Sequence, residues 1–301
     1  MSQLTLLKYL TLEILAPTHA SRAPEPDLVM ADPAQAAAFM EAGREDGPIA
    51  PTYLFHTLQL SQLIRPGDRV LDLACGPANQ LAQVARVNPE AHFLGVDASA
   101  SMLNLARETV ARQALTNVEF MEGYIQSLSD LPDGGFDLVM STMSLHHLPD
   151  TATLAASFRE AARLLKPGGA LYLADFARLK HDSSRRYLVE RSARGQSELF
   201  RTDFLNSLRA AFSVEEFRCE AEAAFGRSSR VIAMKPVPVM LVIWRGKPKP
   251  LSEMVHEKCE GIFQSLNVQQ QCDFQDLRRF FKLGGLVSPD LANISSSITH
   301  T

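Results

Sequence analysis

The chain has 301 residues, of which 46% are hydrophobic, so it can bury a core as one large domain or two small ones. Its net charge of −4 lacks the basic excess that is typical of nucleic-acid-binding domains. No apolar run predicts a membrane span, and residues 1–20 make a poor secretory signal. The cysteines show no metal-binding or disulfide spacing, so we expect no metal and a cytoplasmic protein; they are Cys75, Cys219, Cys259 and Cys272.

Residues 1–49 are predicted to form an N-terminal extension and candidate lid. It begins with a short helix or strand over 1–15, continues through a proline-punctuated stretch over 17–33, and has a turn of helix over 34–40. Helical periodicity resumes over 53–63. Residues 246–301 are predicted to form a C-terminal tail with helices over 252–266 and 274–283, and with disorder over 293–301.

Between these segments, strand and helix patterns alternate, which predicts an α/β fold with a mostly parallel sheet covered on both faces. The expected strands are 70–73, 92–96, 118–121, 137–141 and 170–175. Ser99 or Ser101 is expected to cap one helix and Asp150 another, while 166–169 should end the latter. A helix over 202–212 follows, then an antiparallel pair over 214–219 and 230–235, and the β-branched run 237–244 also predicts a strand.

The first strand runs into a tight turn at Gly76, and an acid, Asp97, ends the second strand. Glycine lets the backbone approach a ligand closely, and the following helix presents unpaired N–H groups to it. An acid about 20 residues after such a turn is where nucleotide-binding α/β units hold the ribose hydroxyls. The turn lacks the G-x-G-x-x-G run that a dehydrogenase uses for pyrophosphate.

Four motifs in order resemble the class I S-adenosylmethionine (SAM)-dependent methyltransferase superfamily, of the small-molecule type: 72–77 (DLACGP), 95–97 (GVD), 136–141 (FDLVMS) and 165–169 (LKPGG). The resemblance covers residues 50–245. It implies a Rossmann-like seven-stranded, mostly parallel sheet whose last strand is antiparallel, with SAM as methyl donor and S-adenosylhomocysteine as product. Ala74 and Ala78 depart from the common family form, where glycines are frequent.

The resemblance also implies a set of cofactor-binding residues. Asp97 would bind the ribose, Asp72 would fix the loop that holds the methionine end, and Tyr124 stands where the family commonly has an acid for the adenine. An alternative for Asp72 is simply to accept N–H groups in its own loop. The full set is Asp72, Ala74, Cys75, Gly76, Asp97, Ala98, Met102, Gly123, Tyr124, Ile125 and Ser141.

Chemistry is expected after the fourth strand, where the family places a residue beside the transferred methyl group. His146, ahead of His147, is predicted to take a proton from the acceptor; the alternative is that the pair only shapes the pocket. By the resemblance, 53–56 would form a lid containing Tyr53, Phe55 and His56, although an ordinary packing helix fits equally. Residues 178–201 are predicted to lie over the site, and the candidate substrate-binding residues are Tyr53, His56, Asp175, Arg178, His181 and Tyr187, with Arg185 and Arg186 at the same edge.

The sequence therefore predicts transfer of a methyl group from SAM to an O, N or C atom of a small-molecule acceptor, without a metal. Two alternatives stay open: an RNA or protein methyltransferase, and a SAM-binding accessory subunit that does not turn over. Because fold resemblance does not identify a substrate, the acceptor is left open. The oligomeric state, including a homodimer, also stays open.

Overall fold

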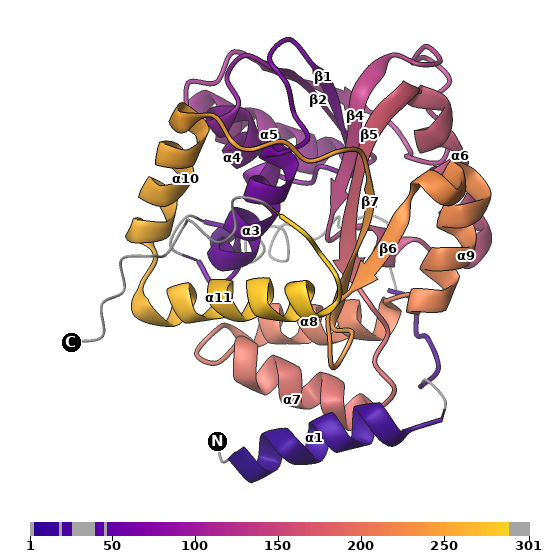
Figure 1. The fold of residues 1–301 in the computed structure, drawn as a ribbon, viewed down its shortest axis with the longest axis vertical. Coiled ribbons are helices and arrows are strands. Elements are labelled where there is room, and N and C mark those ends of the chain that lie inside the picture. Colours follow the sequence, from indigo (N-terminus) through magenta and orange to yellow (C-terminus); the bar gives the residue numbers. More distant parts are fainter. Residues whose placement is uncertain (1–2, 18–19, 26–39, 45–46, 289–301) are drawn as a thin grey trace.

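The computed structural model describes residues 3–17, 20–25, 40–44 and 47–288, and its centre is a seven-stranded sheet (Figure 1). The strand order is β3-β2-β1-β4-β5-β7-β6. Strands β1 to β5 are parallel, and β7 runs antiparallel to both β5 and β6, as the sequence predicts. The bounds are β1 Arg69–Leu73, β2 His92–Asp97, β3 Val118–Glu122, β4 Phe136–Thr142, β5 Leu165–Phe176, β6 Arg230–Ala233 and β7 Met240–Arg245.

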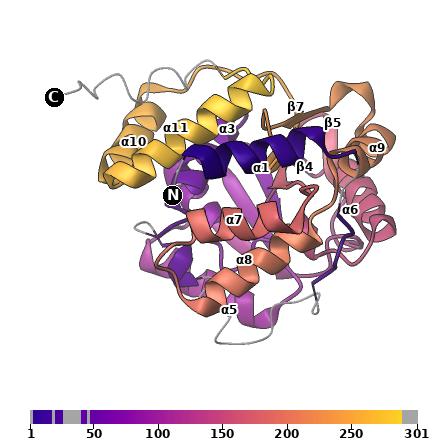
Figure 2. The same cartoon turned by 90° about the horizontal axis from the view of Figure 1, so that it is seen from below.

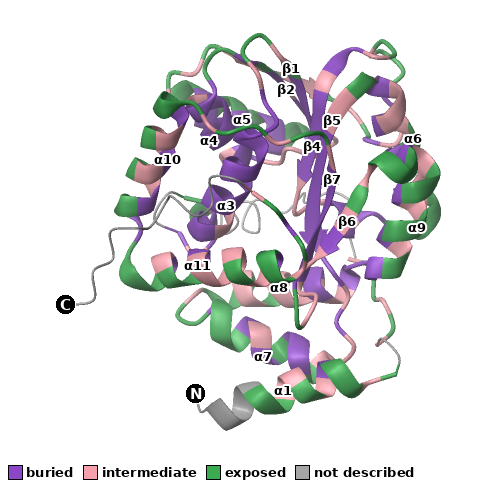
Figure 3. Ribbon diagram, in the orientation of Figure 1, coloured by how far each residue is buried: buried purple, intermediate pink, exposed green. Residues whose placement is uncertain are grey.

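Two apolar cores lie on opposite faces of this sheet because successive strand side chains point to opposite sides. In β1, Val70 belongs to one core and Leu71 to the other. The first core is covered by α3 (Ala50–Ser61), α4 (Asn79–Val87), α10 (Glu253–Ser265) and α11 (Val268–Leu283). The second is covered by α6 (Thr151–Leu164) and α9 (Val214–Phe225), and Figure 3 shows the buried sheet between these layers.

The predicted strand over 214–219 is wrong, because this segment forms the start of α9. Ser213 and Glu216 make a reciprocal capping box at its first turn. Its buried residues follow helical spacing and pack on α6: Val214, Phe217, Ala221 and Phe225. The antiparallel pair is instead β6 with β7. Strand β5 also begins earlier than predicted and takes in 166–169.

The first and the last described helices pack onto the α/β unit. Helix α1 (Gln3–Leu15) lies along α7 (Asp182–Ser192), where the rings of Tyr9 and Tyr187 stack with centroids 4.3 Å apart. Helix α11 lies against α3, and Phe281 stacks on Phe55 at 4.9 Å.

The predicted disorder over 293–301 and most of the helical turn over 34–40 fall outside the described residues. Among the described helices, none has the length and apolar content needed to cross a membrane.

The predicted helix caps explain where two helices begin. Ser99 accepts a hydrogen bond from the Met102 N–H at the start of α5 (Ala100–Arg112), and Asp150 does the same for Thr153 at the start of α6. Figure 2, which views the molecule from below, shows α1, α7, α8 (Glu198–Ala210) and α11 beneath the carboxyl ends of the parallel strands. The segment 178–201, predicted to lie over the site, forms α7 and the start of α8.

Candidate functional site

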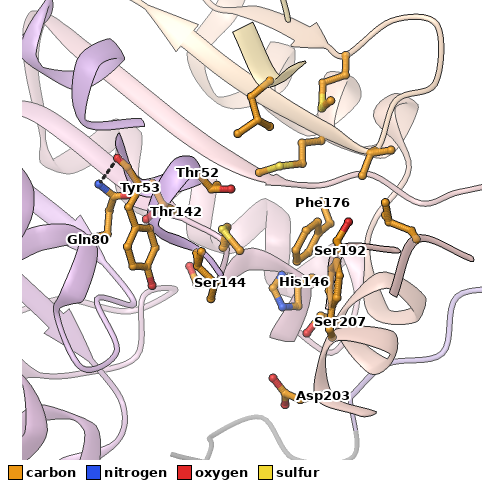
Figure 4. A pocket seen from close by; sticks show the side chains of 18 of the residues that line it. Thr52, Tyr53, Gln80, Thr142, Ser144, His146, Phe176, Ser192, Asp203 and Ser207 are labelled. Carbon is orange, nitrogen blue, oxygen red and sulfur yellow. Dashed lines mark hydrogen bonds between the residues drawn. The ribbon is translucent and has the colours of Figure 1, made fainter. Parts of the chain in front are cut away.

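A cavity of about 830 Å³ opens beyond the carboxyl ends of β1, β2, β4 and β5. Parallel α/β sheets bind ligands at this edge. One part of the cavity is lined by the turns that follow β1, β2 and β3, and the other by α1, α7, α8, α11 and the β6–β7 connection. Figure 4 shows Tyr53, Thr142, Ser144 and His146 directed into the space between these parts.

The turn after β1 is held in an unusual backbone conformation. Ala74, Gly76 and Ala78 have φ values of 58°, 53° and 60°, a left-handed region that glycine adopts most readily. A Cβ built on Gly76 would meet nothing within 4 Å, so backbone conformation rather than lack of space favours glycine there. This turn leads directly into α4, and residues 74–77 line the cavity.

Asp97 connects the end of β2 to this turn. Its Oδ2 accepts a hydrogen bond from the Gly76 N–H at 2.8 Å, and its Oδ1 accepts one from the Ser99 N–H at 2.9 Å. Burial raises the pKa of this carboxyl, although the backbone N–H groups act in the opposite direction. Each carboxylate oxygen has a second lone pair, so Asp97 can still accept from a ligand that enters the cavity.

Asp72 lies deeper, at 2% exposure, and its Oδ1 makes no hydrogen bond with any of the described residues. Burial, followed by the charge of Asp97, raises its pKa well above the ordinary value. An unsatisfied buried carboxylate is costly, and a cationic ligand would relieve that cost. Because Asp72 lines the cavity, it fits a ligand with positive groups, such as the ammonium and sulfonium of SAM.

Most of the predicted cofactor residues meet in the cavity: Asp72, Ala74, Cys75, Gly76, Asp97, Ala98, Met102, Gly123, Tyr124 and Ile125. Ser141 does not line it. The Ser141 hydroxyl is fully buried and donates to the Leu73 carbonyl at 2.7 Å. The residues that follow it, Thr142 and Ser144, line the cavity in its place.

His146 sits at the border between the two parts of the cavity. Its Nδ1 lies 2.7 Å from Oδ1 of Asp175, and its backbone N–H donates to Oδ2 of the same carboxylate at 2.9 Å. Burial by itself would lower the pKa of His146, but Asp175 and then Glu25 raise it above the ordinary value. Contrary to the substrate-binding prediction, Asp175 is fully buried behind His146 and does not line the cavity.

Glu25 is a neighbour of this histidine that the sequence does not reveal. Its Oε1 lies 4.0 Å from Nε2 of His146 and 3.9 Å from Nδ1 of His147, and it accepts from the Ser207 hydroxyl at 2.9 Å. Arg22, in the same stretch of chain as Glu25, fixes residues 20–25 against the site by donating a hydrogen bond to the backbone carbonyl of His146. Burial raises the pKa of Glu25, whereas burial and then His146 lower that of His147 well below its usual value.

These three groups also have the composition of a metal site. One ligand atom each from Glu25, His146 and His147 lies within 4.8 Å of the others. The sequence predicts no metal, and it gives no hint of this cluster because Glu25 is far from the histidines along the chain.

Several predicted substrate contacts do not reach the cavity. His56 is fully buried with its Nδ1 2.7 Å from the Tyr172 hydroxyl, and burial lowers its pKa to about 3. It is therefore part of the core and not of a lid, and Phe55 beside it is equally buried. Arg178 pairs with Glu216 at 2.9 Å.

His181 also does not line the cavity, and its backbone N–H donates to Oε1 of Glu13 in α1 at 3.0 Å. The two arginines at the same edge are held by the protein itself. Arg185 donates to the Leu179 carbonyl at 3.0 Å, and Arg186 pairs with Asp182 at 2.8 Å. Of the predicted substrate residues, Tyr53 and Tyr187 line the cavity.

The strand order and the cavity at the switch from β1 to β4 define an α/β protein with a site for a nucleoside-type ligand. Residues 64–206 match a family model described as a methyltransferase domain. This match, together with the strand order and the curated methyltransferase relatives, supports the resemblance to the class I SAM-dependent methyltransferase superfamily.

Two curated relatives are similar to part of this chain. Trans-aconitate 2-methyltransferase of Deinococcus radiodurans is 42% identical over 121 residues, which are 40% of this chain and 43% of that protein. Demethylmenaquinone methyltransferase of Listeria monocytogenes is 38% identical over 113 residues, which are 37% of this chain and 46% of that protein. The match thus spans less than half of the length of either relative.

Solved structures agree on the fold. A putative SAM-dependent methyltransferase from Methanococcus maripaludis superposes with a TM-score of 0.53 at 18% identity, covering 77% of this chain and 99% of that one. A SAM-dependent methyltransferase from Aquifex aeolicus has a TM-score of 0.51 at 19% identity, covering 71% and 97%. At this identity the likeness concerns the fold alone.

Proposed function

We propose that this protein transfers a methyl group from SAM to a small-molecule acceptor. The observation that carries the proposal is the position of Asp72, a buried residue with an unsatisfied carboxylate oxygen that lines the same cavity as His146. The first group suits a cationic methyl donor, and the second suits an acceptor that must lose a proton.

We assign the donor to the part of the cavity formed by the β1, β2 and β3 turns. Asp97 would accept the ribose hydroxyls with the lone pairs that Gly76 and Ser99 leave free. Asp72 would face the positive groups of the methionine end, and 123–125 with Met102 would enclose the adenine. SAM supplies a methyl carbon made electrophilic by its sulfonium, so the protein has to orient the acceptor and exclude water.

We assign the proton-accepting role to Nε2 of His146. Asp175 accepts from Nδ1–H, so it selects the tautomer whose Nε2 has a free lone pair. A base in this position takes the acceptor proton while the new bond to the methyl group forms. The positive imidazolium would then lie between two carboxylates, Asp175 and Glu25, which stabilise it.

The acceptor is proposed only as a small molecule, with the methylated atom left as O, N or C. The names of the two curated relatives contain trans-aconitate and demethylmenaquinone, which are small molecules of different chemical classes. Both matches cover less than half of either relative. The four free thiols, and the net charge of −4, support a cytoplasmic protein that does not act on nucleic acid.

Calorimetric titration with SAM and a turnover assay based on S-adenosylhomocysteine release test the proposal together. Asp97→Asn should weaken SAM binding about tenfold or more, because a hydrogen bond to a charged group contributes about 1.5–3 kcal/mol. Glu119→Gln is the matched control, since Glu119 is exposed on β3. His146→Gln should retain SAM binding and lose turnover. If the unaltered protein takes up no SAM, the proposed function is wrong.

A further inference from the structure

We infer that the acceptor is a large apolar molecule, which binds in the part of the cavity beyond His146; this rests on the proposed function. Aromatic and aliphatic side chains from separate elements line that part, six of which carry the argument: Tyr187, Leu188, Phe200, Phe204, Met240 and Phe280. They come from α7, α8, β7 and α11. Their convergence makes an apolar chamber next to the proposed base.

The aromatic rings in this chamber continue directly to His146. Phe176 lies with its ring centroid 5.4 Å from that of His146, and Phe204 lies 5.6 Å from Phe176 (Figure 4 shows the first pair). Phe200 follows at 6.3 Å from Phe204. Rings at these separations form one continuous surface, so a flat apolar molecule resting on it would bring a polar substituent to Nε2 of His146.

The placement of charge argues against an anionic acceptor. The described lysine and arginine side chains that line the cavity are exposed, so they belong to its mouth and not to the chamber; they are Arg191, Lys235 and Arg279. His146 also lines the cavity, and when protonated its charge is already balanced by Asp175 and Glu25. A half-buried carboxylate, that of Asp203, lines the cavity close to His146. A carboxylate or phosphate placed there would lose water and meet negative groups, which is costly.

Two nearby arginines, buried Arg185 and half-buried Arg22, are already bonded to the protein itself. Arg185 donates to the Leu179 carbonyl, and Arg22 donates to the carbonyls of His146 and Ala210. Moving either toward a substrate would leave buried carbonyl oxygens without donors. Specificity for an apolar acceptor therefore follows from the apolar lining of the chamber and from the engagement of these two arginines with backbone carbonyl groups.

A matched pair of ligands tests this inference: 2-naphthol, and 6-hydroxy-2-naphthoate, which adds a carboxylate to the same ring system. Both are titrated calorimetrically into the full chain saturated with S-adenosylhomocysteine. We expect 2-naphthol to bind at least about tenfold more tightly, because the carboxylate must be desolvated without a cationic partner. Phe204→Ala should weaken 2-naphthol about tenfold, while Leu199→Ala, on an exposed position of the same helix, should not.

Loss of binding in Phe204→Ala could also result from misfolding, so a gain-of-function variant is included. Phe200→Arg places a cation at the chamber wall and should reverse the preference toward 6-hydroxy-2-naphthoate, with SAM affinity retained. Equal binding of both ligands by the unaltered protein, or binding of neither, would overturn the apolar assignment. SAM affinity measured on the same samples keeps the two proposals apart, because SAM binding without naphthol binding refutes only this inference.

Discussion

Replacing Asp175 by asparagine tests whether this residue sets the chemistry of His146. The carboxylate holds the ring Nδ1 at 2.7 Å and the backbone N–H of the same residue at 2.9 Å. A hydrogen bond that involves a charged partner contributes about 1.5–3 kcal/mol, and one pKa unit corresponds to about 1.36 kcal/mol. Asp175→Asn should therefore lower the pKa of His146 by about 1–2 units.

The assays are an NMR titration of the His146 ring and the pH dependence of kcat. The limb of the rate profile that reports His146 should move toward lower pH by the same amount as the NMR titration. The value of kcat should fall about 100-fold or more, since a mispositioned base loses most of its contribution. SAM affinity should not change, because Asp175 does not line the cavity.

Asp137→Asn is the matched control for this experiment. Asp137 accepts from Lys166 at 2.7 Å in β4, so the variant also removes a paired carboxylate, but one that has no contact with His146. The reasoning is refuted if Asp175→Asn leaves both the His146 titration and the rate profile unmoved, or if Asp137→Asn changes them equally.

Three further outcomes are expected. The pairing of protonated His146 stabilises the fold fully below about pH 6.5, and this stabilisation is lost as pH rises through the raised pKa of His146. Denaturant unfolding at a series of pH values should show the free energy of unfolding falling over this range, and His146→Gln should reduce that fall. Ala74→Gly should raise the free energy of unfolding by up to about 1 kcal/mol, because relief of about 1–2 kcal/mol of left-handed strain exceeds the entropic cost of glycine; a loss of stability in urea would contradict this. Added Zn²⁺ should inhibit turnover by binding Nε2 of His146 beside Glu25, and a chelator should restore turnover. Inhibition that persists undiminished in Glu25→Gln would show that the metal acts elsewhere.

Local sequence was sufficient for the α/β fold and for the turn that follows β1. Apolar strand runs, a glycine turn and the helix caps Ser99 and Asp150 act over a few neighbouring residues, so their effect can be predicted from a short window. The meeting of Gly76 with Asp97 was also predictable, because parallel strands bring their carboxyl ends to one edge. The assignment of these residues to SAM remains a prediction.

Long-range packing decided the rest of the site. The capping box of Ser213 and Glu216 is a local signal for the helix over 214–219 that the predicted strand overlooked, and the apolar stripe of this helix then packs on α6. His56, in contrast, lies in the core because of a distant partner, Tyr172 in β5. The pairing of Asp175 with His146 was likewise invisible in sequence, as was the approach of Glu25. Such contacts depend on which surfaces are buried against each other once the sheet has formed. No local pattern encodes the distance between residues that lie from 29 positions apart, as His146 and Asp175 do, to more than a hundred, as His56 and Tyr172 do.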